Sequence, residues 1–305
     1  MKAFKQSFTA LFTKAFIRGF SLLSLKNCHR FGSLLGWLMT VIPNRSRHVT
    51  KVNVRLCFPE MRAEQQQYLV KNSLIEMGKT IAEISPMWQW DKKQLFQTIK
   101  SVEGEELLEQ ALLKNKGVIL AAPHLGCWEL LGHYLADKYP TTCMYQKPKI
   151  KQLDSIIRKG RERFGVKLVP TDSHGIRSML KSVKNNELIC ILPDQEPSAG
   201  NGVFVPFFDV NAYSMILISR LAKKTGATVL TIYAKRLKNG QGYDVVFKPL
   251  DQINTESIED SVIYLNNEIE KCVCEIPEQY QWSYKRFRTQ PMDESGKPIE
   301  DYYNS

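Results

Sequence analysis

The sequence lacks several features that would define a class at once. Its seven cysteines include no C-x-x-C pair, and an odd, dispersed set argues against both a zinc ribbon and a disulfide framework. This cysteine usage is typical of a reducing compartment. With 17 Gly and 14 Pro among 305 residues, the chain is neither collagen-like nor of low complexity. We therefore expect a globular protein without metal or cofactor.

Acidic side chains are absent from the first 59 residues, which carry ten Lys and Arg. The remaining 246 residues hold 32 basic and 31 acidic side chains, so the formal charge of +11 resides mainly in a basic N-terminal arm. This pattern differs from a uniformly basic chain that wraps nucleic acid, and no nucleic-acid-binding signature is present. A hydrophobic content of 43% is enough for a substantial core.

The basic arm is also apolar, in two runs over residues 15–25 and 31–42. The second run would form a helix of about 18 Å, too short for a hydrocarbon core of about 30 Å. Arg18 interrupts the first run and no cleavage site follows the second, so a secretory signal fits poorly. We expect residues 1–45 to be a helical arm lying in the interface of an anionic membrane, and residues 46–305 to be the main domain. A helical pair packed on that domain is the alternative, and both can hold together.

Beyond the arm, helical spacing over residues 62–85 predicts a helix that ends at Pro86. From Gly117 onward, strands and helices alternate, with a Pro/Gly-rich loop over 193–202. This order predicts an α/β fold with a mixed, partly parallel sheet flanked by helices. The expected strands are 118–122, 142–145, 167–170, 188–192, 228–236 and 243–248, and the expected helices are 129–137, 153–164, 176–184, 212–224 and 258–274.

Residues directly after the strand 118–122 are the first candidates for a site, because ligands bind beyond the carboxyl ends of parallel strands. His124 and Glu129 lie there, five positions apart. On one continuous helix they would be about 140° apart, but they can converge if His124 sits in a turn that Gly126 permits. A carboxylate on one imidazole nitrogen would leave the other free to remove a proton. A buried histidine that caps a helix is the structural alternative.

Other chemistries are open at this point. Cys127 next to His124 would suit a cysteine hydrolase, although a packed, inert thiol is commoner. The spacing of His124 and His133 does not fit a zinc enzyme. A non-catalytic protein that binds a membrane surface would explain the arm and leave His124 and Glu129 without a role.

Ordered blocks of the sequence resemble the His-x4-Asp/Glu glycerolipid-type acyltransferases and, more narrowly, the bacterial lipid A biosynthesis acyltransferases, the late lauroyl and myristoyl transferases. The similarity runs from about residue 5 to 290 and is carried by His124-Leu125-Gly126-Cys127-Trp128-Glu129, Tyr145-Gln146-Lys147-Pro148, Gly160-Arg161-Glu162-Arg163-Phe164-Gly165, Leu192-Pro193-Asp194-Gln195, Gly202-Val203-Phe204-Val205-Pro206-Phe207-Phe208 and Pro277-Glu278-Gln279-Tyr280-Gln281-Trp282-Ser283-Tyr284-Lys285-Arg286-Phe287.

The resemblance implies transfer of a fatty acyl chain from acyl carrier protein to a hydroxyl of a lipid A precursor, at the cytoplasmic face of the inner membrane. His124 would be the general base and Glu129 would orient its ring. Backbone N–H groups at Gly126 and Cys127, before a helix, would stabilise the oxyanion. Another glycolipid or a lysophospholipid is the alternative acceptor.

Four further side chains are candidates for substrate binding. Residues 141–169 carry eight basic side chains and two acidic ones, among them Lys147, Arg161 and Arg163. Arginine forms bidentate contacts with phosphate, which both substrates of such a reaction carry. Asp194 follows a strand and is equally suited to substrate contact or to a structural cap. These residues do not determine the length of the acyl chain, the acylated position, the choice between acyl carrier protein and coenzyme A, or the oligomeric state.

Overall fold

A seven-stranded sheet forms the centre of the protein, in the computed structural model that describes residues 13–148, 150–293 and 298–304. Across the sheet, the strands are β1 (Ile99–Glu103), β9 (Tyr243–Pro249), β8 (Thr228–Arg236), β2 (Val118–Ala121), β5 (Leu188–Ile191), β3 (Thr141–Tyr145) and β4 (Lys167–Pro170). All neighbours are parallel except β8 and β9, which are antiparallel. The expected mixed, partly parallel α/β sheet is confirmed.

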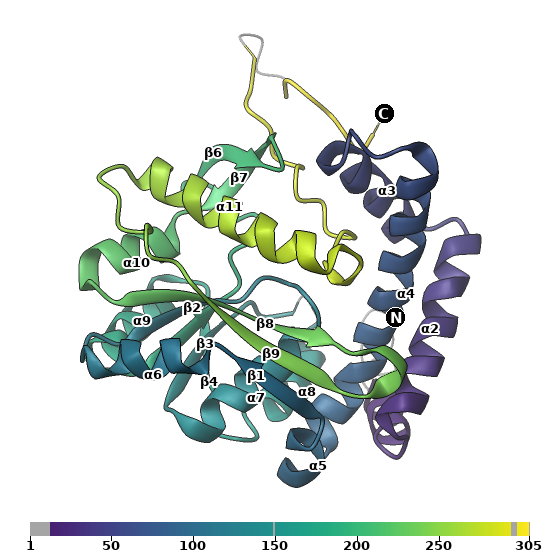
Figure 1. The fold of residues 1–305 in the computed structure, drawn as a ribbon, viewed down its shortest axis with the longest axis horizontal. Coiled ribbons are helices and arrows are strands. Elements are labelled where there is room, and N and C mark those ends of the chain that lie inside the picture. The colour runs from purple at the N-terminus through teal and green to yellow at the C-terminus, as the bar shows by residue number, and fades with distance from the viewer. Residues whose placement is uncertain (1–12, 149, 294–297, 305) are drawn as a thin grey trace.

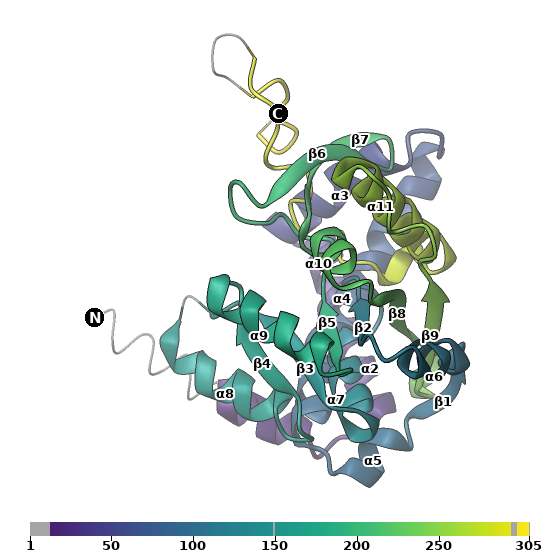
Figure 2. The ribbon, with the colours of Figure 1, turned by 90° about the vertical axis from the view of Figure 1, so that its left-hand side faces the viewer.

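The central strand β2 is fully buried because helices cover both faces of the sheet. Its side chains alternate, with Ile119 and Ala121 in one core and Val118 and Leu120 in the other. In Figures 1 and 2, α10 and α11 lie above the sheet and α7 and α8 lie below it. The helices around the sheet are α5 (Lys92–Phe96), α6 (Glu105–Leu113), α7 (Trp128–Lys138), α8 (Lys151–Arg161), α9 (Ser173–Lys184), α10 (Leu217–Thr225) and α11 (Ile258–Glu275).

An N-terminal helical layer stands beside this sheet, at the right of Figure 1. Residues 13–20 are helical, followed by α2 (Leu25–Val41), α3 (Arg45–Cys57) and α4 (Ala63–Gln89). Gly32 and Gly36 of α2 meet Gly78 of α4 so closely that a Cβ at any of them would collide with the opposing backbone. The described part of the arm, residues 13–45, is therefore packed on the rest of the protein, and residues 1–12 of the expected arm lie outside the described residues. Within the described ranges, no helix has both the length and the apolar character needed to cross a membrane.

Two details of the expected chain path are wrong. The helix 62–85 does not end at Pro86 but continues through it to Gln89, because burial of Met87 and Trp88 outweighs the one backbone N–H that proline lacks. The segment 212–224 is only partly helical. Its first residues form β7 (Val210–Met215), where burial alternates along the strand, and only α10 is a helix.

A hairpin accounts for the second difference. β7 pairs antiparallel with β6 (Gly202–Phe207). The apolar spacing of β7 alone does not distinguish a short strand from a helix. The two-residue turn, Phe208 and Asp209, has both φ angles positive, as tight hairpins require. The short strand β1 and the helices α3, α5 and α6 were not expected from the sequence.

The contact between α2 and α4 gives the first testable prediction. Gly78→Val should push the two helices apart and lower the free energy of unfolding by about 1–3 kcal/mol or more, as overpacking does. Thermal unfolding in detergent measures it. Gly19→Ala is the matched control, since no atom lies within 4 Å of the added Cβ. Equal melting of the Gly78→Val variant and the wild type would show that the two helices do not need this close contact.

Candidate active site

His124 lies just beyond the carboxyl end of β2, and Asp194 lies just beyond the carboxyl end of β5. Because β2 and β5 are adjacent and parallel, the two ends meet at the same edge of the sheet. The Nδ1 of His124 is 2.8 Å from Oδ1 of Asp194, and the His124 backbone N–H donates to Oδ2 at 2.8 Å. One carboxylate thus fixes both the backbone and the ring of this histidine.

The hydrogen bonds around the ring assign its tautomer. Nδ1 donates its proton to Asp194, which leaves Nε2 as an acceptor. The side-chain amide of Gln195 is 3.2 Å from Nε2 and also donates to Oε1 of Gln281 at 3.0 Å. Burial alone would raise the pKa of the Asp194 carboxyl, but the charge of His124 and the hydrogen bonds from its ring and backbone hold that pKa below its ordinary value. Asp194 is therefore ionised and suited to stabilise a charged imidazole.

A cavity of about 900 Å³ opens at this histidine. Polar side chains line the end at His124, among them Glu129, Arg161 and Gln195. Most of the exposed lining is apolar and includes Val166, Leu168, Ile176, Leu180, Leu217 and Leu221, with further polar side chains such as Asn201 and Arg220 among them. The cavity thus combines a basic nitrogen with an apolar chamber large enough for a long hydrocarbon.

Glu129 does not hold the ring of His124, contrary to the expectation from their spacing. It is the second residue of α7, and its carboxylate accepts two hydrogen bonds from Nε of Arg161, at 2.9 and 3.1 Å, and one from the indole of Trp88 at 2.9 Å. A further hydrogen bond from Nη2 of Arg161 completes the pairing. Because α7 turns Glu129 toward α8 and α4, the ring is oriented by Asp194 instead.

Two of the four basic or acidic binding candidates lie at the cavity, and two lie elsewhere. Arg161 lines the cavity, although Glu129 occupies much of its donor capacity, and Asp194 lies at the ring of His124. Arg163 instead donates to the backbone carbonyl of Trp90 at 2.7 Å, and Lys147 is exposed outside the cavity lining. A substrate role for Lys147 or Arg163 therefore has no support from their positions.

The sequence suggests that the backbone N–H groups of Gly126 and Cys127 stabilise an oxyanion. In the structure, both N–H groups already donate to other backbone carbonyls. Gly126 donates to the carbonyl of Gln279 at 3.0 Å, and Cys127 donates to the carbonyl of Ala234 at 2.8 Å. Each amide has only one hydrogen, so Gly126 holds the loop against the turn at Gln279 and Cys127 holds it against β8. Gly126 adopts a positive φ of 63°, and a Cβ there would collide with Ala234. Burial raises the pKa of the Cys127 thiol well above its ordinary value, which makes it a poor nucleophile.

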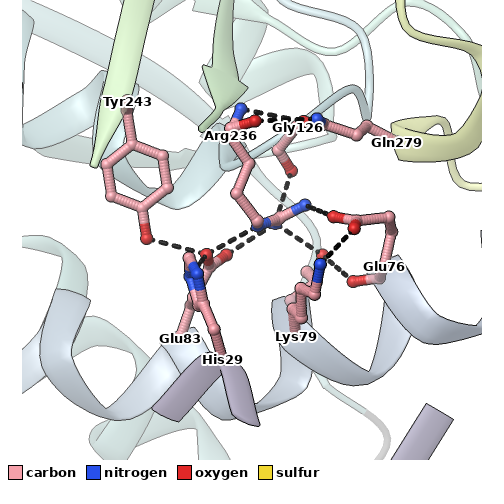
Figure 3. A network of polar contacts seen from close by, with 9 residues as sticks. His29, Glu76, Lys79, Glu83, Gly126, Arg236, Tyr243 and Gln279 are labelled. Atoms are coloured by element: carbon pink, nitrogen blue, oxygen red, sulfur yellow. Dashed lines mark hydrogen bonds and ion pairs between the residues drawn. The ribbon is translucent and has the colours of Figure 1, made fainter. Parts of the chain in front are cut away.

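A buried polar network anchors the same loop from behind (Figure 3). The guanidinium of Arg236 at the end of β8 donates to both oxygens of Glu83 at 2.6 Å, to Glu76 at 2.8 Å and to the carbonyl of Gly126 at 3.4 Å. The Tyr243 hydroxyl donates to Glu83 at 2.7 Å. Glu83 also contacts Nε2 of His29 on α2 at 2.5 Å. The network therefore joins the N-terminal helices to the segment that carries the site.

Gln195 and Gln281 are the site residues that the sequence reasoning missed. Both lie in blocks that carried the family resemblance, 192–195 and 277–287. The resemblance therefore points to their surroundings. Nothing in the sequence indicates that the Gln195 side chain lies between Gln281 and Nε2 of His124.

Comparison with known proteins identifies the family of the chain. A family described as "Bacterial lipid A biosynthesis acyltransferase" matches residues 3–289. The chain is 26% identical to the lipid A biosynthesis palmitoleoyltransferase of Escherichia coli (strain K12) over 87% of this chain and 86% of that protein. It is 26% identical to the lauroyltransferase of the same organism, over 86% of each chain. The myristoyltransferase of that organism is 24% identical over 82% of this chain and 77% of its own length.

The buried network gives the second prediction. Burial alone would raise the pKa of Glu83, but the charge and hydrogen bonds of Arg236 hold that pKa far below its ordinary value. Glu83→Gln leaves the Arg236 charge without its main partner and should cost about 3–5 kcal/mol in the free energy of unfolding. Chemical denaturation at neutral pH measures the loss.

A depressed carboxyl pKa contributes its full stabilisation above the pKa of the unfolded state and loses it as pH falls toward the folded-state pKa, so the wild type should lose this advantage in acid. The free energies of unfolding of the wild type and the Glu83→Gln variant should therefore converge at acidic pH. Glu109→Gln, on the exposed face of α6, is the control. A Glu83→Gln variant as stable as the Glu109→Gln variant at neutral pH would contradict the role given to the ion pair.

Proposed function

Because the chain belongs to the bacterial lipid A biosynthesis acyltransferase family and is an acyltransferase, we propose that it moves a fatty acyl chain from acyl carrier protein to a hydroxyl of a lipid A precursor. One observation carries the proposal: Asp194 orients His124 so that Nε2 carries no proton, and His124 lines a large, mainly apolar cavity. The lipid A precursor provides the hydroxyl, and the thioester of the donor provides the acyl group.

In this reaction, Nε2 of His124 takes the proton of the acceptor hydroxyl as its oxygen attacks the thioester carbonyl. The tetrahedral intermediate collapses as the carbon–sulfur bond breaks, and the imidazolium returns the proton to the leaving sulfur. Asp194 stabilises that imidazolium and keeps Nε2 facing the cavity. The side-chain amide of Gln195 lies beside Nε2, and the N–H that it directs at Nε2 is released once the ring is protonated, so it can donate to negative charge at the carbonyl oxygen.

In this proposal, Glu129 and Arg161 are structural and binding residues and take no part in the proton transfer. Their ion pair forms a polar wall of the cavity and joins α7 to α8. The side chain of Arg161 remains 32% exposed, so it can also contact a phosphate of the acceptor while it is paired. Burial would raise the pKa of Glu129, but Arg161 holds it below its ordinary value, so this carboxylate is charged and is not a general acid at neutral pH.

The outer face of α2 supports the proposal that the protein attaches to a membrane surface. Six large apolar side chains of α2 and its C-terminal cap are exposed there: Phe31, Leu34, Trp37, Leu38, Val41 and Ile42. Basic residues of the arm, including Lys26 and Arg30, are exposed beside them. This combination of apolar area and positive charge suits the anionic cytoplasmic face of the inner membrane, where lipid A precursors would be met.

Two other candidates have less support. Another glycolipid or a lysophospholipid could supply the hydroxyl, since the cavity wall alone does not identify the acceptor. A cysteine-based mechanism would require a reactive Cys127, which is 2% exposed and has a raised thiol pKa.

The third prediction tests the function and the base together. In cells that lack this protein, the wild-type gene should add the mass of one acyl chain to lipid A, measured by mass spectrometry. His124→Ala and Asp194→Asn should each lower the rate in purified enzyme by about 10² to 10⁴, because the base or its charged partner is lost. The loss from Asp194→Asn should lie in kcat and not in the KM for acceptor.

Asp137→Asn, which removes a surface ion pair with Lys92, is the control and should keep full activity. Cys127→Ser should also remain active, since the acceptor oxygen attacks directly. A fully active His124→Ala enzyme, or an acyl group covalently attached to Cys127 in the wild type, would contradict the mechanism. Unchanged lipid A in all strains would contradict the function itself.

The fourth prediction concerns membrane attachment. Leu34→Gln combined with Leu38→Gln leaves the packed face of α2 intact and removes apolar area from its outer face. Binding to vesicles that contain phosphatidylglycerol should fall by about tenfold or more, because each buried aliphatic side chain contributes about 1.5–3 kcal/mol. Leu113→Gln, which is more exposed than either leucine but lies on α6, is the control. Unchanged sedimentation with vesicles would show that α2 does not insert.

A further inference from the structure

Helices α9 and α10 form a basic surface without a single acidic residue in either helix. On α9, His174, Arg177, Lys181 and Lys184 are all exposed, and at about 100° per residue they fall within about 80° of the helix circumference. On α10, Arg220, Lys223 and Lys224 are exposed. The two helices pack against each other, which places their exposed basic side chains near one another.

This surface is continuous with the mouth of the cavity. Ile176 and Leu180 of α9 line the cavity from the side next to the basic stripe, and Arg220 and Lys224 of α10 belong both to the lining and to the surface. The acidic side chain nearest along the chain, Asp172, is used to cap α9, where it accepts hydrogen bonds from the amides of His174 and Gly175. A molecule that docks on these helices can therefore extend a group directly into the chamber that leads to His124.

The position and composition of the surface distinguish it from the membrane-binding face. Figure 1 places α2 at one side of the sheet and α9 and α10 at the other, and Figure 2 shows α9 and α10 in the foreground with α2 behind. Of the large hydrophobic side chains exposed in the described residues, none lies on α9 or α10. A membrane surface binds through apolar area together with charge, whereas charge alone suits a soluble acidic partner.

We propose that α9 and α10 form the docking surface for an acidic acyl carrier protein, which inserts its acyl arm into the cavity between them. The inference rests on the proposed function, because only a protein-bound donor needs such a surface. It separates the routes of the two substrates: the donor arrives from the aqueous side at α9 and α10, and the lipid acceptor arrives from the side that α2 holds at the membrane. Charge complementarity would then set the encounter rate and its dependence on salt.

The test reverses charge outside the cavity lining. Arg177→Glu combined with Lys181→Glu should raise the dissociation constant for acyl carrier protein about tenfold or more, since like charges face each other across the interface. The KM for the acyl carrier protein donor should rise similarly, with kcat and the KM for acceptor unchanged. Lauroyl, myristoyl and palmitoleoyl donors are used in parallel. Transfer from the matching acyl-pantetheine, which carries no protein, should be unaffected.

Lys51→Glu combined with Arg55→Glu is the matched control, because it reverses the same charge at the same spacing on the exposed face of α3. Equal weakening by the control would reduce the effect to a diffuse positive field and overturn the docking surface. So would unchanged binding of acyl carrier protein by the α9 variant, or an equal loss with acyl-pantetheine. Loss of vesicle binding by the α9 variant alone would make this face a membrane surface and overturn the proposal as well.

The binding measurement separates this inference from the proposed function. If the wild type transfers acyl groups from all these donors but the α9 variant binds acyl carrier protein unchanged, the function stands and the docking surface fails. If the wild type binds acyl carrier protein through α9 but transfers no chain to the lipid A precursor, the docking surface stands and the proposed function fails.

Discussion

The parallel pairing of β2 with β5 is the constraint on which the site depends. It brings together the ends of two strands whose following residues, His124 and Asp194, are 70 positions apart in the chain. A buried carboxylate is costly unless it is paired, and the ring and backbone of His124 satisfy both oxygens of Asp194. The same bonds fix the tautomer that leaves Nε2 free. Sheet topology thus determines which atom can act as the base.

A second layer of interactions keeps the loop after His124 in place. Gly126 and Cys127 donate their amides to neighbouring strands and turns, and Arg236 reaches the Gly126 carbonyl from the buried network. Through Glu83 and His29, this network extends to α2. The helix proposed to meet the membrane is therefore joined to the active-site loop by buried polar contacts. Within the described residues, α2 and the loop after His124 thus belong to one packed body.

The outer surface is divided by chemistry. Exposed apolar side chains gather on α2, and exposed basic side chains without acidic neighbours gather on α9 and α10. Such a division suits an enzyme whose acceptor is a membrane lipid and whose donor is soluble. In the proposed reaction, each face meets its own kind of partner, and the acyl chain and the hydroxyl meet in the cavity that His124 lines.

The sequence by itself determined the alternation of strands and helices, the position of His124 after a buried strand, and the family. These follow from local apolar periodicity and from ordered blocks of residues. Local spacing also suggested Glu129 as the partner of His124, and a helix over 212–224, and both were wrong. Only the tertiary structure decided the partner of His124 and the structure of residues 212–224. The order of the strands determines which side chains meet, and pairing across the turn determines the hairpin. The pairings of Asp194 with His124, and of Glu129 with Arg161, join residues 70 and 32 positions apart, and no local pattern records which distant carboxylate reaches which cation or ring.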